Sequence, residues 1–110
     1  MTVKEIEHID FNKGDGIVPV IVQDSNSKDV LTLAYTNKES LKLTKETGKS
    51  WFWSRSRNKL WMKGEESGNT QIVKKILVDC DSDAIIYLVE PSGPACHTGK
   101  QTCFHNDMKF

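Results

Sequence analysis

The stretch that decides the fold is TQIVKKILVDCDSDAIIYLVE, residues 70–90. Residues 70–79 are mostly β-branched and aliphatic, and residues 84–90 have the same character, as expected for two strands. The aspartates and the serine between the two runs are common turn formers. The sequence therefore predicts an antiparallel hairpin with Asp79, Asp81 and Asp83 at its bend.

The rest of the chain contains further runs of β-branched and aromatic residues. They predict strands at 18–22, 30–35, 50–54 and 60–63. The first two runs flank a polar turn at 23–29 and should form a second hairpin. Pro19 is expected near the start of its strand or on an edge, because proline has no amide proton to donate.

One principal helix is predicted between these strands. Asn37 can cap its first turn, and the helix should continue to about Thr47, where Gly48 provides a left-handed stop. One helix among about six strands predicts a single α+β domain over residues 1–110, with mainly antiparallel pairing.

Composition narrows the classes of function. The chain has 110 residues, with fifteen basic and fifteen acidic side chains, so no global charge attracts nucleic acid. No window approaches the ~18 apolar residues of a membrane span. The start, MTVKEIEHIDF, is acidic and lacks an apolar run, unlike a signal or transit peptide. We expect a cytoplasmic protein without a nucleic-acid or membrane partner.

The three cysteines could form a metal site. Cys96 and Cys103 lie seven residues apart in PACHTGKQTCF, and Cys80 is sixteen residues before Cys96. No C-x-x-C is present, which excludes a zinc finger or ribbon knuckle. Three thiolates suit a zinc ion that keeps one position for water, and His97 or His105 could instead close that position. Three buried thiols without a metal are the alternative.

Carboxylates surround one of these cysteines, and negative neighbours oppose thiolate formation. In an extended chain Asp79, Asp81 and Asp83 point to one face and Cys80 points to the other. This alternation predicts two sites, a softer ion on sulfur and Mg²⁺ on the carboxylates. Ordinary turn formation explains the same residues without a metal.

Basic and aromatic residues gather in SWFWSRSRNKLWMKGEESGNTQ, residues 50–71. Arg55 and Arg57 share a face of an extended strand, and Lys63 precedes a loop with two glycines. Such a set can bind a phosphate-bearing ligand, although two strand arginines are often only solvated. The tryptophans could stack on a base or fill the core. P-loop and dinucleotide cradles are excluded, because neither glycine motif is present.

Four motifs together resemble the phosphoribosyl-AMP cyclohydrolase family. They are LAYTN (33–37), SRSRNKLWMKGEESGNTQ (54–71), DCDSDA (79–84) and GPACHTGKQTCF (93–104). The resemblance implies that Cys80, Cys96 and Cys103 bind Zn²⁺ and that Asp79, Asp81 and Asp83 bind Mg²⁺. It also implies an intertwined homodimer, with Cys80 from one chain and the other two zinc ligands from its partner.

The resemblance further implies the reaction, a step of histidine biosynthesis. Zinc-activated water would hydrolyse the N1–C6 bond of the adenine ring in 1-(5-phosphoribosyl)-AMP, giving the formimino carboxamide ribotide. His97 is the candidate for proton transfer, or else an orienting residue beside the metal. The candidate substrate-binding residues are Ser54, Arg55, Ser56, Arg57, Trp61, Lys63, Ser67 and Gly68.

Two other functions fit parts of the sequence. A zinc nucleobase deaminase would carry H-x-E and P-C-x-x-C, and the chain has ACHTG and no C-x-x-C. A binding module with a structural Cys₃His zinc site could read single-stranded nucleic acid through the basic-aromatic strand. The zero net charge and the single basic cluster argue against that module.

Overall fold

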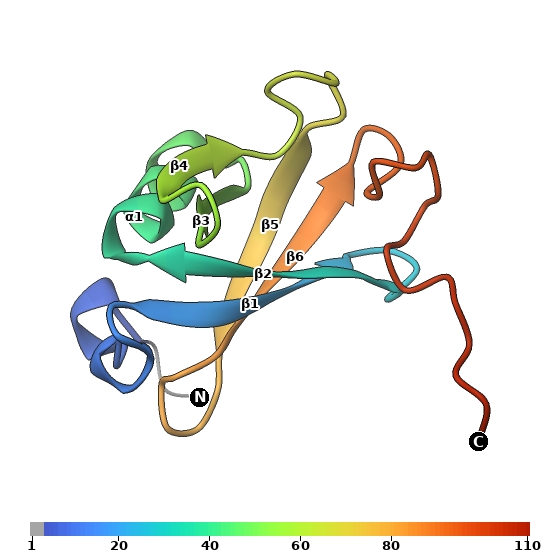
Figure 1. Cartoon of the computed structure of the whole chain (residues 1–110). Coiled ribbons are helices and arrows are strands. Elements are labelled where there is room, and N and C mark those ends of the chain that lie inside the picture. The colour runs from blue at the N-terminus through green and yellow to red at the C-terminus, as the bar shows by residue number, and fades with distance from the viewer. Residues whose placement is uncertain (1–3) are drawn as a thin grey trace.

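One α-helix and a two-stranded ribbon lie together on one face of a four-stranded sheet in the computed structural model, which describes residues 4–110 (Figure 1). The sheet has the order β2-β1-β6-β5, and β3 pairs with β4. The α+β class is confirmed. No helix among residues 4–110 is long and apolar enough to cross a membrane. The elements are η1 (Ile6–His8), η2 (Asn12–Gly14), β1 (Ile17–Asp24), β2 (Val30–Asn37), α1 (Lys38–Thr47), β3 (Trp51–Ser54), β4 (Lys59–Met62), β5 (Gln71–Val78) and β6 (Ile85–Pro91).

Both predicted hairpins of the main sheet are confirmed. β5 pairs with β6 antiparallel up to Val78 opposite Ile85, and β1 pairs with β2 in the same sense. The sheet also contains a parallel pair, β1 with β6, that begins at Val20 opposite Ile85. Pro19 therefore lies near the start of an interior strand, just before this pairing begins, where its missing amide proton costs no bond to β6.

The helix begins and ends where the sequence predicts. The Asn37 side chain accepts from the Ser40 amide, and the Ser40 hydroxyl accepts from the Asn37 amide, both at 2.8 Å. This reciprocal pair satisfies donors that the first helical turn leaves free. Gly48 ends the helix with φ 74°, and its amide donates to the Thr44 carbonyl.

The core lies between one face of the sheet and the layer of α1 with the β3–β4 ribbon. Alternate residues of β1 are buried, including Val18, Val20 and Val22. They pack with Phe52 of the ribbon and Leu41 of the helix. The period of two along β1 is the pattern of a strand with one covered face.

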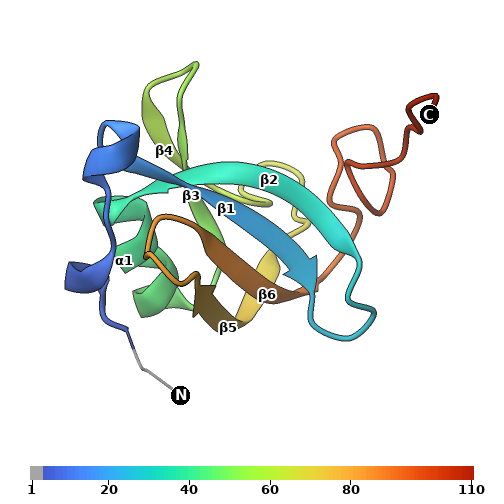
Figure 2. The same cartoon turned by 90° about the horizontal axis from the view of Figure 1, so that it is seen from below.

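The opposite face of the sheet, here called the open face, carries an apolar row across all four strands. Register places Leu33, Ile21, Ile86 and Leu77 side by side. Leu33 is 47% exposed. Three of these residues fall on β1, β6 and β5 and line a groove of about 960 Å³ that also reaches Cys80. In Figure 2, α1 and the ribbon lie behind the sheet, so they do not cover this row.

Candidate metal and substrate site

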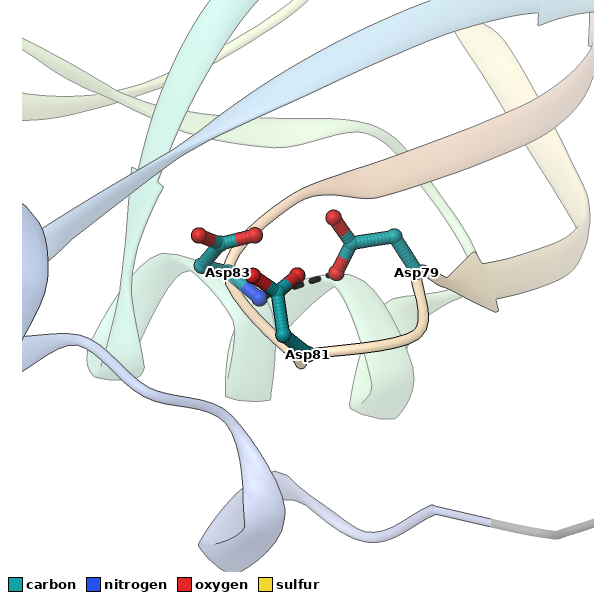
Figure 3. Close-up of side chains that lie close together, drawn as sticks. All are labelled: Asp79, Asp81 and Asp83. Atoms are coloured by element: carbon teal, nitrogen blue, oxygen red, sulfur yellow. Dashed lines mark hydrogen bonds between the residues drawn. The ribbon is translucent and has the colours of Figure 1, made fainter.

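The β5–β6 bend gathers the three aspartates into one cluster. The donor oxygens of Asp79, Asp81 and Asp83 lie within 4.8 Å of one another. One oxygen of Asp79 accepts from the Asp83 amide at 2.9 Å (Figure 3), and it also accepts from the Ala84 amide at 3.2 Å. Ser82 is left-handed, with φ 64°. The aspartates therefore meet because the chain turns tightly. The expectation that they share a face of an extended chain is wrong.

The aspartate cluster already holds a cation from the N-terminal segment. The Lys13 ammonium lies 3.2 Å from Oδ2 of both Asp81 and Asp83. A hydrogen bond with Asp81, followed by Asp79, raises the pKa of Asp83, while hydrogen bonds with Asp83 and then Lys13 lower the pKa of Asp81. Three converging carboxylates fit a hard divalent cation such as Mg²⁺.

Two of the cysteines lie together in the loop that follows β6. The Cys96 sulfur is 3.1 Å from the Thr98 hydroxyl, and the Cys103 amide donates to the Leu31 carbonyl of β2 at 2.7 Å. Hydrogen bonds from Thr98, with smaller contributions from Cys103 and the Lys63 charge, lower the pKa of Cys96. A lower pKa favours the thiolate, which is the form that binds zinc.

Cys80 lies at the other end of the sheet. It belongs to the β5–β6 bend, whereas the Cys96 loop follows the far end of β6 (Figure 1). The seven residues of β6 put about 20 Å between those ends. Within residues 4–110, the three aspartates form the only group of three or more potential metal ligands whose donor atoms lie close together. One chain therefore brings together two of the three zinc ligands expected from the sequence.

The β3–β4 turn carries Arg55 to the same end of the molecule as the aspartates. Its guanidinium lies over the Tyr35 ring, 3.8 Å from the centroid. Tyr35 pairs with Pro19, and the next residue of β1 pairs with β6 beside the bend. Two strand spacings, about 10 Å, thus separate Tyr35 from the bend.

The hydroxyls of this turn stabilise its shape. Ser54 Oγ accepts from the Arg57 amide at 3.2 Å and lies 3.4 Å from Ser56 Oγ. β3 ends at Ser54, so Arg55 and Arg57 lie in a closed turn, and the expectation that they share a face of an extended strand is wrong. Arg55 is anchored on an aromatic ring.

Lys63 and the loop after it lie at the end of the sheet that carries Cys96 and Cys103. The amide of Ser92, just after β6, donates to the Thr70 carbonyl at the end of this loop. Ser67 Oγ accepts from the Asn69 amide at 3.1 Å, and the Gly68 amide donates to Gly64 O at 2.8 Å. The Gly68 amide is thus engaged within the loop, although the sequence suggested amides free for phosphate.

Two candidate aromatic residues differ in their surroundings. Trp61 is half-buried and its ring centroid lies 4.9 Å from that of Phe52, so packing alone accounts for it. His97 is exposed and follows Cys96 directly. His105, the alternative ligand, contacts the carbonyl of Thr102 at 3.0 Å through Nδ1.

Sequence reasoning missed three residues of these clusters, namely Lys13, Tyr35 and Thr98. Lys13 meets its partners across 68 and 70 residues of sequence, and no local pattern indicates such a pair. Tyr35 lies within the LAYTN motif, and Thr98 lies two residues after a candidate ligand. Tyr35 and Thr98 each lie within one of the four motifs, and this position could have identified them.

Comparisons with known proteins identify the family that the four sequence motifs resemble. The family model described as Phosphoribosyl-AMP cyclohydrolase matches residues 32–105. The chain is 76% identical over 106 residues to a phosphoribosyl-AMP cyclohydrolase of Nitrosopumilus maritimus, covering 96% of this chain and 98% of that protein. It is 55% identical to a phosphoribosyl-AMP cyclohydrolase of Clostridium botulinum, covering 98% and 99% of the two chains. It is 62% identical to a histidine biosynthesis bifunctional protein of Bacillus subtilis, covering 96% of this chain and 50% of that protein. The chain belongs to the phosphoribosyl-AMP cyclohydrolase family.

Proposed function

We propose that this chain carries out the cyclohydrolase reaction as a homodimer, with two active sites that each draw on both chains. The reaction adds water across the N1–C6 bond of the adenine ring of 1-(5-phosphoribosyl)-AMP, in histidine biosynthesis. The observation that carries the dimer proposal is the division of the candidate residues between opposite ends of one sheet. Cys80, the aspartates and Arg55 lie at one end, and Cys96, Cys103 and Lys63 lie at the other.

A two-fold axis that lies between two facing open faces and runs across the strands would join these ends. Such an axis exchanges the two ends of the sheet, so Cys80 of one chain would meet the partner's Cys96 and the partner's Cys103. The apolar row Leu33, Ile21, Ile86 and Leu77 gives the two copies a surface to bury. The groove on this face reaches Cys80, which would place the zinc ligands at the edge of the buried area.

Two metals would be held by different donors. Zn²⁺ would bind Cys80 with the partner's Cys96 and the partner's Cys103, because thiolates suit this softer ion. Mg²⁺ would bind Asp79, Asp81 and Asp83, whose oxygens converge within 4.8 Å. When bound, the zinc ion would supply hydroxide near neutral pH, and the magnesium ion would supply positive charge that stabilises a phosphate or polarises the purine.

The side chains of this protein would then position the substrate and move protons. Arg55 and Arg57, with Ser54 and Ser56, would bind one phosphate. Lys63 and Ser67 of the partner would bind the other, which suits a substrate whose two phosphates lie far apart. His97 would take a proton from the attacking water and return it to the leaving nitrogen N1. Trp61 would contribute an aromatic surface for the base.

Co-expression of two inactive variants tests the shared site. In a mixed dimer, one chain carries Cys80→Ser and the other carries Cys96→Ser. One of its two sites takes Cys80 from the Cys96→Ser chain, and takes Cys96 and Cys103 from the Cys80→Ser chain. That site keeps all three sulfurs, so random pairing should restore about a quarter of the wild-type ring-opening rate. The ultraviolet change on ring opening, with zinc content measured on the same sample, gives the result.

The matched control is co-expression of Cys96→Ser with Cys103→Ser. Both substitutions fall in one loop, so every mixed site lacks a sulfur and activity should stay absent. If the first pair also stays inactive although mixed dimers are isolated, the shared zinc site is wrong. If the wild-type protein binds zinc and does not change the absorbance of phosphoribosyl-AMP, the proposed reaction is wrong.

A further inference from the structure

The N-terminal segment, residues 4–15, clamps the β5–β6 bend and lies outside residues 32–105 that the family model matches. The Asp10 amide donates to the Ser82 carbonyl at 2.8 Å, and the Lys4 ammonium donates to the Ser82 hydroxyl. Lys13 adds its two ion pairs, each at 3.2 Å. Backbone and charge contacts from one segment therefore meet at the bend that carries the aspartates.

The Lys13 ammonium lies between the two carboxylates with the most available oxygens. One Asp79 oxygen is already engaged by two backbone amides, whereas Asp81 and Asp83 both turn Oδ2 toward Lys13. A magnesium ion binds carboxylate oxygens at about 2.1 Å, so a metal shared by Asp81 and Asp83 would lie within a few ångströms of this ammonium. Like charges at that separation repel each other strongly.

Space for a hydrated ion exists beside the cluster. A cavity of about 280 Å³ is lined by Asp83, Lys13 and Asp10, together with residues of β1. Lys13 has a half-exposed side chain, at 51%, so it can swing into solvent without opening the core. A cation that enters this cavity meets Lys13 together with the carboxylates of Asp83 and Asp10.

We propose that Lys13 is a resident counterion of the aspartate cluster, which a divalent cation must displace. The ammonium keeps the carboxylates of Asp81 and Asp83 together when no metal is bound. Metal binding then breaks both ion pairs, and the N-terminal segment keeps its hydrogen bonds to Ser82 and the packing of Ile9 in the core. This inference rests on the proposed function in one respect, the binding of Mg²⁺ by these aspartates. If Lys13 must be displaced, it lowers the affinity of the aspartate cluster for the metal. It also links metal occupancy to the mobility of residues 4–15.

Titration of the full-length, zinc-containing protein with Mn²⁺, followed by the electron paramagnetic resonance signal of free Mn²⁺, tests the inference. The variant Lys13→Met removes the competing charge and keeps much of the side-chain volume. Its Mn²⁺ Kd should be about three- to tenfold lower than that of the wild type, as expected for two exposed ion pairs. Mg²⁺ should displace the Mn²⁺ from both proteins.

Amide exchange gives a second readout that does not depend on activity. Mg²⁺ should speed exchange of the wild-type Asp10 amide, because the clamp loses its ion pairs. In Lys13→Met that amide should exchange fast with or without Mg²⁺. The matched control is Lys74→Met, which removes a lysine of similar exposure (53%) that is paired with Glu90 at 3.6 Å. This control should leave Mn²⁺ affinity and Asp10 exchange at wild-type values.

Three results would overturn the inference. If Lys13→Met and the wild type bind Mn²⁺ with equal affinity, Lys13 does not compete, and the proposed Mg²⁺ site stands. If Lys13→Met binds Mn²⁺ more weakly, Lys13 supports the site instead of opposing the metal. If neither protein binds Mn²⁺, the assignment of Mg²⁺ to the aspartates fails, and the inference fails with it.

Discussion

His97 is the proposed proton carrier in the loop that holds Cys96 and Cys103. It is exposed, and it follows Cys96, whose sulfur is held by Thr98. We expect His97→Ala to lower kcat by about 10²-fold while zinc stays bound, because the variant loses a proton carrier and no metal ligand. The ultraviolet assay and metal analysis of the same sample measure both effects. His105→Ala is the matched control from the same loop and should keep kcat, and an unchanged kcat in His97→Ala would exclude the proton-transfer role.

Tyr35 restricts the orientation of Arg55, the proposed phosphate ligand. The guanidinium lies 3.8 Å from the ring centroid, a cation–π contact that limits where the arginine can point. Tyr35→Leu should raise KM for phosphoribosyl-AMP by about two- to fivefold with little change in kcat. Tyr35→Phe keeps the ring and should retain the wild-type KM. An equal rise of KM in both variants would show that the hydroxyl matters and the stacking does not.

Residue types were the predictable part of the candidate site, and their contacts were not. Asp79, Asp81 and Asp83 converge as the sequence indicates, because aspartates and serines favour a bend. The cause is a set of backbone hydrogen bonds to Asp79, which a period of two cannot indicate. The roles of Cys80, His97 and the phosphate-binding residues stay predictions.

Gly48 determines where the only α-helix among residues 4–110 ends. Its φ of 74° is a left-handed conformation, which residues other than glycine adopt at an energetic cost. No atom lies within 4 Å of an added Cβ, so a substitution there causes no steric clash. Gly48→Ala should lower the free energy of unfolding by about 1 kcal/mol. Urea unfolding at fixed protein concentration measures this change.

Gly14→Ala is the matched control for this helix stop. A Cβ there would meet only Ile17 Cγ1 at 3.8 Å, and Gly14 has no positive φ. The change in unfolding free energy should stay within about 0.5 kcal/mol. If both alanine variants lose the same stability, the left-handed conformation is not the cause of the loss at Gly48.

Local elements were predictable because their signals lie within a few residues. The helix cap at Asn37, the stop at Gly48 and both hairpins of the main sheet follow from side chains next to each boundary. The parallel pairing of β1 with β6 has no such signal, because Val20 and Ile85 are far apart in the sequence. This pairing places β1 inside the sheet, hydrogen-bonded to β2 along one edge and to β6 along the other, and that arrangement depends on the whole fold.

The open face is the feature of the whole molecule that the dimer proposal uses. Ile86 lies in the middle of the apolar row, between Ile21 and Leu77. Ile86→Lys would place two like charges near a two-fold axis and should convert the dimer to monomers at micromolar concentration. Sedimentation velocity measures the state, and activity should fall with the dimer because each site needs both chains.

A conservative substitution separates packing from charge at this position. Ile86→Val keeps an apolar side chain and should remain dimeric and active. A wild-type protein that sediments as an active monomer would contradict the shared site. At this scale the motifs from residue 33 to residue 104 were enough to indicate the family, while the cytoplasmic location and the dimer stay predictions.

The central position of β6 also constrains how the polypeptide is made. β6 is the last strand in the sequence, yet it lies between β1 and β5 in the sheet. During synthesis, the N-terminal hairpin must wait with an unpaired strand edge until residues 85–91 leave the ribosome. Such an edge is a template for association with other chains. Release of a product truncated before Ile85 should therefore yield aggregates, and the completed chain should acquire its structure late and in one cooperative step.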